Sequence, residues 1–485
     1  MIRKTLAFAA LYLGRALGSA ADSSLPAIKP NILWLIAEDM SPHFGCYGDQ
    51  VIQTPNVDRL ARNGMLFERA FVTGSICSPS RSALITGMYQ TSIGAQHHRS
   101  GVGQEKINLS SGVELVPRLF QHAGYYACNG GYHPAQRKGK TDYNFEFDPH
   151  LYDGTDWSGR KSGQPFFAQI QLLGGKTRDL PAELATARAQ LGNATPKDNL
   201  PLPPYYPRTP AILADWAATL DAVRITDRQV GEIVARLEKE GLLDQTVIFF
   251  VSDHGVSHAR GKQFLYDEGT HIPFVVCGPG IPPGLRRKDL IEHIDMAAIS
   301  LTLAGISLPA QMQARNSLAS DYRAREAVFS ARDRADETVD HIRSVRTERF
   351  KYIRNFLPLR PHLQPNAYKD HKPCVIALRA AEAAGQLDDV QRLLFAPTRA
   401  PEELYDLAVD PWEIRNLAAD PAQAATLRQL RSRLDLWMEQ TNDHGRTPEP
   451  ESSYDSDMAA NLGRKPNPEI QKNIVLMKQW AREGK

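Results

Sequence analysis

The sequence predicts an α/β protein, in which a large mixed, mostly parallel sheet lies between helices and a smaller α+β domain follows. Short apolar runs that end abruptly in acidic residues alternate with helix-like segments between about residues 30 and 315. From residue 316 to about 445, short strand-like runs joined by turns replace that alternation, which indicates a small antiparallel sheet. Residues 446–485 are polar with scattered proline, and we expect a tail without a firm fold.

The first apolar run, residues 31–37, ends at Glu38-Asp39, as a strand buried in a parallel sheet does when its carboxyl end reaches a ligand site. Apolar residues at helical spacing, with proline near the start or glycine after the end, predict helices over 55–63, 113–122, 210–240 and 295–305. Short apolar runs between them predict strands over 125–129, 165–173, 246–251 and 273–277. Residues 174–207 are rich in proline, and we expect an irregular excursion over the face where the strands end.

In the smaller domain, residues 342–346, 350–354 and 402–406 predict short, half-exposed strands. Asp420-Pro421 predicts the start of a helix. That helix carries Leu427, Leu430, Leu434 and Trp437 on one face, which would cover the sheet.

Composition narrows the choice of partners. Lys plus Arg (57) nearly balances Asp plus Glu (55) among 485 residues, so no overall electrostatic field favours a nucleic acid partner.

The longest apolar run, residues 6–13, is shorter than the roughly 18 residues of a membrane span. It follows Arg3-Lys4 and precedes Gly18-Ser-Ala-Ala21, which predicts a signal peptide over residues 1–21 and export to the periplasm or the medium. A disordered N-terminus is the alternative.

The segment Cys77-Ser78-Pro79-Ser80-Arg81 is the most informative motif. It predicts the start of a helix whose N-terminus can hold an anion, although a cysteine can also be a small buried apolar residue. Five cysteines are too few for a disulfide scaffold, and their odd number leaves at least one thiol unpaired. Asp253-His254-Gly255 ends a second buried strand, as Glu38-Asp39 ends the first. These segments are therefore expected to meet at one sheet edge.

From about residue 31 to 442, the chain resembles the sulfatases of the alkaline-phosphatase-like superfamily, in which the cysteine of Cys-x-Pro-x-Arg is oxidised to formylglycine. It looks most like the sulfamidase, or heparan N-sulfatase, branch. The motifs that carry this likeness are residues 38–42, 45–48, 140–145 and 343–354. The resemblance implies a catalytic domain over 30–315 that removes a sulfate or sulfamate group from a carbohydrate, with N-sulfoglucosamine as a candidate. It also implies a formylglycine-generating partner enzyme.

The chemistry explains the residue types. A hydrated aldehyde at position 77 offers one hydroxyl to attack sulfur and a second to expel sulfate. Oxygen ligands suit a divalent cation, with calcium fitting better than magnesium. The expected ligands are Glu38, Asp39, residue 77, Asp253 and His254, the last at a position where the family supplies Asn or His.

Basic side chains should bind the sulfate oxygens. Arg81 lies one turn beyond residue 77, while Lys140 and Lys262 match two lysines of the family. Surface lysines are the alternative for both. Where the family commonly has two histidines, this chain has Asp142 and Lys176, and Lys176 could bind sulfate or donate a proton if burial lowers its pKa.

Other charged residues have no firm assignment from sequence. His97, His98, His133 and His258 are without a role, with His133 the best candidate among them. Arg332-Asp333-Arg334 and Asp336 either recognise a sugar or are solvated charges, and Arg286-Arg287-Lys288 is expected in a solvent-facing turn.

Two rival functions stay open from the sequence. One is a phosphonate monoester or phosphodiester hydrolase of the same superfamily. The other is a non-catalytic protein that binds sulfated glycans, which the two missing histidines suggest.

Overall fold

The computed structural model describes residues 29–132 and 138–485. The predicted signal peptide and His133 lie outside the described residues. In the described part of the chain, no helix combines the length and apolar character needed to cross a membrane.

The main sheet has eight strands in the described residues, in the order β3-β4-β1-β5-β7-β2-β6, with β8 beside β2. The strands are β1 (Asn31–Ala37), β2 (Gly64–Phe71), β3 (Tyr126–Gly131), β4 (Phe166–Leu172), β5 (Thr246–Ser252), β6 (His271–Ile272), β7 (Phe274–Cys277) and β8 (Leu285–Glu292). The strands β3, β4, β1 and β5 are parallel neighbours, whereas β7 runs antiparallel to both β5 and β2. Strands β1, β5 and β2 therefore point the same way and end at the same edge.

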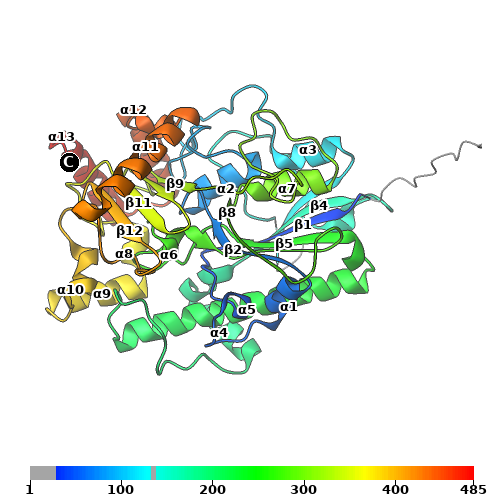
Figure 1. The fold of residues 1–485 in the computed structure, drawn as a ribbon, viewed down its shortest axis with the longest axis horizontal. Coiled ribbons are helices and arrows are strands. Elements are labelled where there is room, and N and C mark those ends of the chain that lie inside the picture. The colour runs from blue at the N-terminus through cyan, green and yellow to red at the C-terminus, as the bar shows by residue number, and fades with distance from the viewer. Residues whose placement is uncertain (1–28, 133–137) are drawn as a thin grey trace, which may run out of the picture.

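Helices cover both faces of this sheet, with α1, α4 and α5 on one side and α2, α3 and α7 on the other (Figure 1). Their bounds are α1 (Pro55–Arg62), α2 (Cys77–Thr86), α3 (Val116–His122), α4 (Pro181–Leu191), α5 (Pro210–Lys239), α6 (Asp267–Thr270) and α7 (Asp295–Leu303). In β1, Leu33 and Leu35 belong to the same core as Trp216 of α5, while Trp34 and Ile36 belong to the core that contains Phe120 of α3. Burial on both faces explains why β1 is continuously apolar.

The predicted α/β class is correct, but several elements differ. Strand β2 was not predicted, because Glu68 and Arg69 interrupt its apolar pattern. Residues 286–288 lie in strand β8 rather than in a turn, with Arg286 paired to Glu68 and Arg287 to Asp289. The excursion at 174–207 is not wholly irregular, since it contains α4.

The second sheet is antiparallel, in the order β12-β11-β10-β9, with β9 (Val328–Arg332), β10 (Ile342–Arg346), β11 (Phe350–Asn355) and β12 (Glu402–Asp406). Helices α8 (Ala367–Asp370), α9 (Pro373–Ala383), α10 (Asp389–Arg392) and α11 (Ala424–Gln440) complete this region. The strands are mostly buried, which corrects the half-exposed prediction. Helix α11 packs on β10 and β11, and the main domain also contacts the sheet, where Tyr266 donates a hydrogen bond to Glu403.

Residues 446–485 are not a tail. They form α12 (Glu451–Arg464) and α13 (Pro468–Arg482), whose Tyr454, Met458 and Met477 are buried together. Buried Arg334, which follows β9, forms ion pairs with Glu449 and with Asp457 of α12. These contacts hold the C-terminal helices against the body of the protein.

Candidate active site

Cys77 is the first residue of α2, and its side chain is only 3% exposed. The preceding Ile76 has an extended backbone and provides no side-chain cap, so backbone N–H groups of the first turn face the site without a capping side chain. A helix N-terminus of this kind favours an anion. The local fold thus places the thiol where an anionic group would bind.

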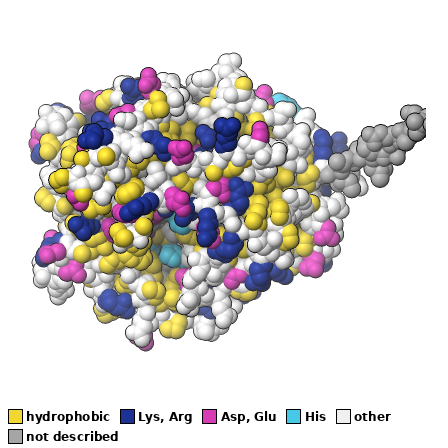
Figure 2. Space-filling view, in the orientation of Figure 1, with side chains coloured by type: hydrophobic (Ala, Val, Ile, Leu, Met, Phe, Trp, Pro, Cys, Tyr) yellow, Lys and Arg dark blue, Asp and Glu magenta, His cyan; other side chains and the backbone are white. Residues whose placement is uncertain are grey.

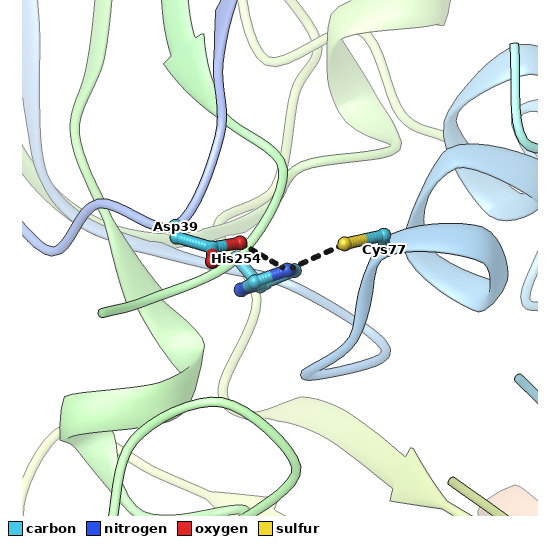
Figure 3. A group of neighbouring side chains, drawn as sticks. All are labelled: Asp39, Cys77 and His254. Atoms are coloured by element: carbon cyan, nitrogen blue, oxygen red, sulfur yellow. Dashed lines mark hydrogen bonds and ion pairs between the residues drawn. The ribbon is translucent and has the colours of Figure 1, made fainter. Parts of the chain in front are cut away.

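The ends of β1 and β5 bring acidic residues and a histidine to this thiol. Figure 3 shows Asp39, which follows β1, and His254, which follows β5, pointing toward Cys77. The Nε2 atom of His254 lies 3.2 Å from the Cys77 sulfur and 3.1 Å from Asp39 Oδ1. Ligand atoms of Glu38, Cys77 and Asp253 also lie within 4.8 Å of one another. Three buried carboxylates and an imidazole therefore converge on one point.

Four basic side chains surround the same point. Lys262 Nζ lies 3.1 Å from the Cys77 sulfur and 3.1 Å from Asp39 Oδ1. The Nε of Arg81 donates to Asp253 Oδ2 at 3.0 Å, and Lys140 donates to Glu38 at 3.0 Å. Lys176 also forms an ion pair with Glu38. The structure thus gathers the whole predicted set, namely Glu38, Asp39, Cys77, Arg81, Lys140, Lys176, Asp253, His254 and Lys262.

The balance of burial and charge sets the protonation of these groups. Burial alone would raise the pKa of the Cys77 thiol, but Lys140 and Lys262 outweigh it and hold that pKa well below its usual value. Burial would likewise raise the pKa of Asp39, and Lys262 and His254 overcome it. The centre therefore stabilises negative charge on the residue at position 77.

The condition under which Lys176 could donate a proton, a pKa lowered by burial, is not met. Burial acts in that direction, but the charges of Cys77 and Glu38 outweigh it, so the pKa of Lys176 is raised. Lys176 is consequently suited to bind an anion as a permanent cation and poorly suited to give up a proton.

The structure contradicts the solvated-charge interpretation of Arg332, Asp333 and Arg334. All three are buried, and each forms an ion pair: Arg332 with Asp340, Asp333 with Arg343, and Arg334 with Glu449. His258 is also buried, and its ring lies beside Asp215 and Arg178. Asp336 differs, because it lies at the site next to His98.

Sequence reasoning missed other residues of the site. The hydroxyl of Tyr368, from α8, lies 3.4 Å from Asp39 Oδ2, and Gln171 accepts a hydrogen bond from Arg81 at 2.7 Å. No local motif marks either one. Three residues of the site that are not glycine, Asp39, Asp142 and Asp336, have positive φ angles, which are costly and cluster at functional sites.

On the face drawn in Figure 2, histidine side chains are visible within a hollow whose rim carries Lys and Arg side chains. A buried thiol at a helix N-terminus, cations around it and carboxylates at strand ends define a hydrolase of anionic esters with an alkaline-phosphatase-like fold. Comparison with known proteins makes the class specific. Residues 30–306 match the sulfatase family model, and residues 254–360 match the model of the N-sulphoglucosamine sulphohydrolase C-terminal region.

The chain belongs to the sulfatase family and is a sulfuric ester hydrolase. It is 32% identical to an ulvan-active sulfatase of Formosa agariphila, over 89% of this chain and 78% of that protein. It is 28% identical to N-sulphoglucosamine sulphohydrolase of Homo sapiens, over 85% of this chain and 90% of that protein. A solved 2-O GAG sulfatase has the same fold, with a TM-score of 0.61 and 21% identity over 88% of this chain and 98% of that chain. Sulfatases generally use formylglycine and a divalent metal ion.

Proposed function

We propose that this protein is an exported, calcium-dependent sulfatase that acts on a sulfated carbohydrate after a maturation enzyme converts Cys77 to formylglycine. The observation that carries the proposal is the position of the Cys77 sulfur, within 3.2 Å of both Lys262 and His254 at the N-terminus of α2. In the described structure, that sulfur stands in for the oxygens of the hydrated aldehyde. The aldehyde hydrate would supply the nucleophile and the means of releasing sulfate.

The residues of the chain divide the remaining work. Lys140, Lys176 and Lys262 are placed to bind the anionic oxygens of the substrate, whose negative charge would otherwise be buried without a partner. Arg81, at 3% exposure, is held by Asp253 and Gln171 and positions the carboxylate beside it.

The donor set fits a hard divalent cation. Glu38, Asp39 and Asp253 are buried carboxylates at the ends of two strands, and His254 lies between Asp39 and residue 77. A predominance of oxygen donors favours calcium or magnesium, and the preference of calcium for several carboxylates favours calcium. Such an ion would balance the sulfate charge and favour the ionised form of the attacking hydroxyl.

The substrate is proposed to be N-sulfoglucosamine at the end of a glycan. The match of residues 254–360 to the N-sulphoglucosamine sulphohydrolase model and the likeness to the human enzyme of that name support this choice. The N-terminal pattern of a positive start, an apolar run and small residues supports export.

The test is to compare kcat/KM for N-sulfoglucosamine and for glucosamine 6-O-sulfate, using enzyme coexpressed with a formylglycine-generating enzyme. We expect a clear preference for the N-sulfated sugar, and no activity from Cys77→Ala on either. A preference for the O-sulfate would overturn the substrate proposal but not the membership of the family. Fractionation of the producing cells tests export, since protein found only in the cytoplasm would contradict it.

A further inference from the structure

The leaving group of this reaction needs a proton, and the two family positions that would supply it hold Asp142 and Lys176. Cleavage of a sulfamate must release an amine rather than a strongly basic amide anion, and cleavage of an alkyl sulfate must release an alcohol. Lys176 forms an ion pair with Glu38, and Asp142 forms one with Lys140 at 3.3 Å. Both groups are thus held by neighbours within the site.

His98 lies at the same centre but comes from a different segment, the loop that follows α2. A ring nitrogen of His98, a carboxylate oxygen of Asp142 and the sulfur of Cys77 all lie within 4.8 Å of one another. The side chain is only 3% exposed. Its Nδ1 lies 3.0 Å from Asp336 Oδ1, within ion-pair distance, and both ring nitrogens are buried without a partner of hydrogen-bond geometry in the part of the chain that the structure describes.

The backbone holds this histidine firmly. His98 donates its N–H to the carbonyl of Arg334 at 2.8 Å, and Arg99 donates its N–H to the Ser78 hydroxyl at 2.8 Å. Ser78 is the neighbour of Cys77 in α2, so the loop is tied to the helix that carries the nucleophile. Arg99 and Asp336 have positive φ angles of 53° and 52°. Such strained backbone persists where the surrounding structure fixes a side chain for function.

We propose that His98, positioned by Asp336, donates the proton to the leaving group. This inference rests on the nucleophile proposed above at residue 77. An aspartate at Nδ1 orients the ring and stabilises the imidazolium, which leaves Nε2–H to act toward the reacting atoms. The hydroxyl at position 77 releases its proton to water as its oxygen bonds to sulfur, while the bond from sulfur to the bridging nitrogen or oxygen breaks and its electron pair stays on that atom. The proton from His98 converts the atom to an amine or alcohol, and water returns a proton to the imidazole.

The experiment compares substrates whose leaving groups differ in their need for a proton. 4-Nitrophenyl sulfate releases a weakly basic phenolate, whereas N-sulfoglucosamine and glucosamine 6-O-sulfate release strongly basic groups. We expect His98→Gln to lower kcat on whichever sugar the wild type cleaves by about 10²- to 10³-fold, and on the nitrophenyl ester by less than about 10-fold. Asp336→Asn should show the same pattern with a smaller loss, about 10- to 100-fold on the sugar.

The matched control is His97→Gln, which changes the adjacent histidine, whose ring faces Glu449 instead of the thiol. His97→Gln should leave kcat on the sugar and kcat on the nitrophenyl ester within about threefold of the wild-type values. An equal loss on both substrates in His98→Gln, or no loss on either, would overturn the proposal. A wild type that cleaves no sulfated substrate at all would instead refute the proposed function.

A second measurement does not depend on the folding of the His98 variant. In a crystal structure of Cys77→Ser with N-sulfoglucosamine bound, Nε2 of His98 should lie within about 3.2 Å of the bridging nitrogen. Lys176 or another side chain in that place, with His98 out of hydrogen-bond reach, would overturn the assignment.

Discussion

The ammonium group of Lys262 lies 3.1 Å from the sulfur of Cys77. The side chain of this lysine is almost fully buried, and it also contacts Asp39 at 3.1 Å. A single cation therefore links the predicted nucleophile to a predicted metal ligand. Because both partners are anionic, burial of the lysine is offset by attraction, and its pKa is raised well above the usual value.

Replacing this lysine should remove charge stabilisation at the reacting centre. We expect Lys262→Met to lower kcat/KM by about 10²- to 10³-fold, the usual effect of losing one preorganised donor to a developing anion. Steady-state kinetics is the measurement, with formylglycine and calcium contents determined on the same sample. Lys161→Met, an exposed lysine, should behave like wild type. Unchanged kinetics in Lys262→Met would show that this cation does not serve the reaction.

The three carboxylates predict dependence on a divalent ion. Chelation should abolish activity and added calcium should restore it, while Asp39→Asn and Asp253→Asn should each lose calcium binding in calorimetric titration, since an anionic ligand is removed. Asp142→Asn is the matched control, because Asp142 lies near Cys77 but outside the proposed ligand set. Full calcium affinity in Asp39→Asn would contradict the assigned ligands.

The C-terminal helices should depend on Arg334. Its guanidinium is buried and lies 2.8 Å from Glu449 and 2.7 Å from Asp457. Arg334→Met leaves two acids without their partner, so we expect a loss of about 3–5 kcal/mol in the free energy of unfolding. Arg228→Met removes an ion pair with Glu232 in which both side chains are exposed, and it should cost at most about 1 kcal/mol. Thermal unfolding of the two variants should separate them clearly, and equal melting temperatures would refute the buried pairing.

Buried histidines predict loss of stability in acid. Burial lowers the pKa of His97, His258, His271 and His293 to about 4 in the folded protein. In the unfolded chain these histidines take up a proton below about pH 6.5, whereas in the folded protein they do so only near pH 4. The free energy of unfolding should therefore be independent of these histidines above pH 6.5 and should fall between about pH 6.5 and 4. Each histidine contributes about 1–2 kcal/mol of that loss at pH 5.

His271→Gln removes one of the four, so its melting temperature should fall less than that of the wild type between about pH 7.5 and 5. His122→Gln, at a surface position, should follow the wild type. Identical pH dependence in all three proteins would mean that His271 takes up its proton equally well in the folded state.

Much of the fold and most of the centre could be predicted because the signals are local. Glu38, Asp39 and Asp253 directly follow runs that are apolar on both faces, and Cys77 begins a recognisable motif. The parallel direction of β1, β2 and β5 then brings these residues together. Strand β2 itself was missed, because its polar residues at 68 and 69 break the apolar pattern.

The parts of the site that could not be predicted depend on contacts between residues that are far apart in the sequence. Tyr368 reaches Asp39 from a chain position 329 residues away, and His98 acquires a partner only because Asp336 lies beside it in the fold. Helices α12 and α13 were missed for a different reason. Their buried residues Tyr454, Met458 and Met477 are few and are separated by polar positions, so their apolar stripe is too narrow to recognise without the surface it covers.

The central claim is that residue 77 acts as formylglycine, and intact mass spectrometry of the peptide that contains it is the most direct test. When the protein is coexpressed with a formylglycine-generating enzyme, the peptide should be about 18 Da lighter than the cysteine form. Sulfatase activity should rise in proportion to the fraction of residue 77 that is converted to formylglycine. Cys77→Ala should fold but have no activity. A fully active preparation in which residue 77 is entirely unmodified thiol would contradict the account.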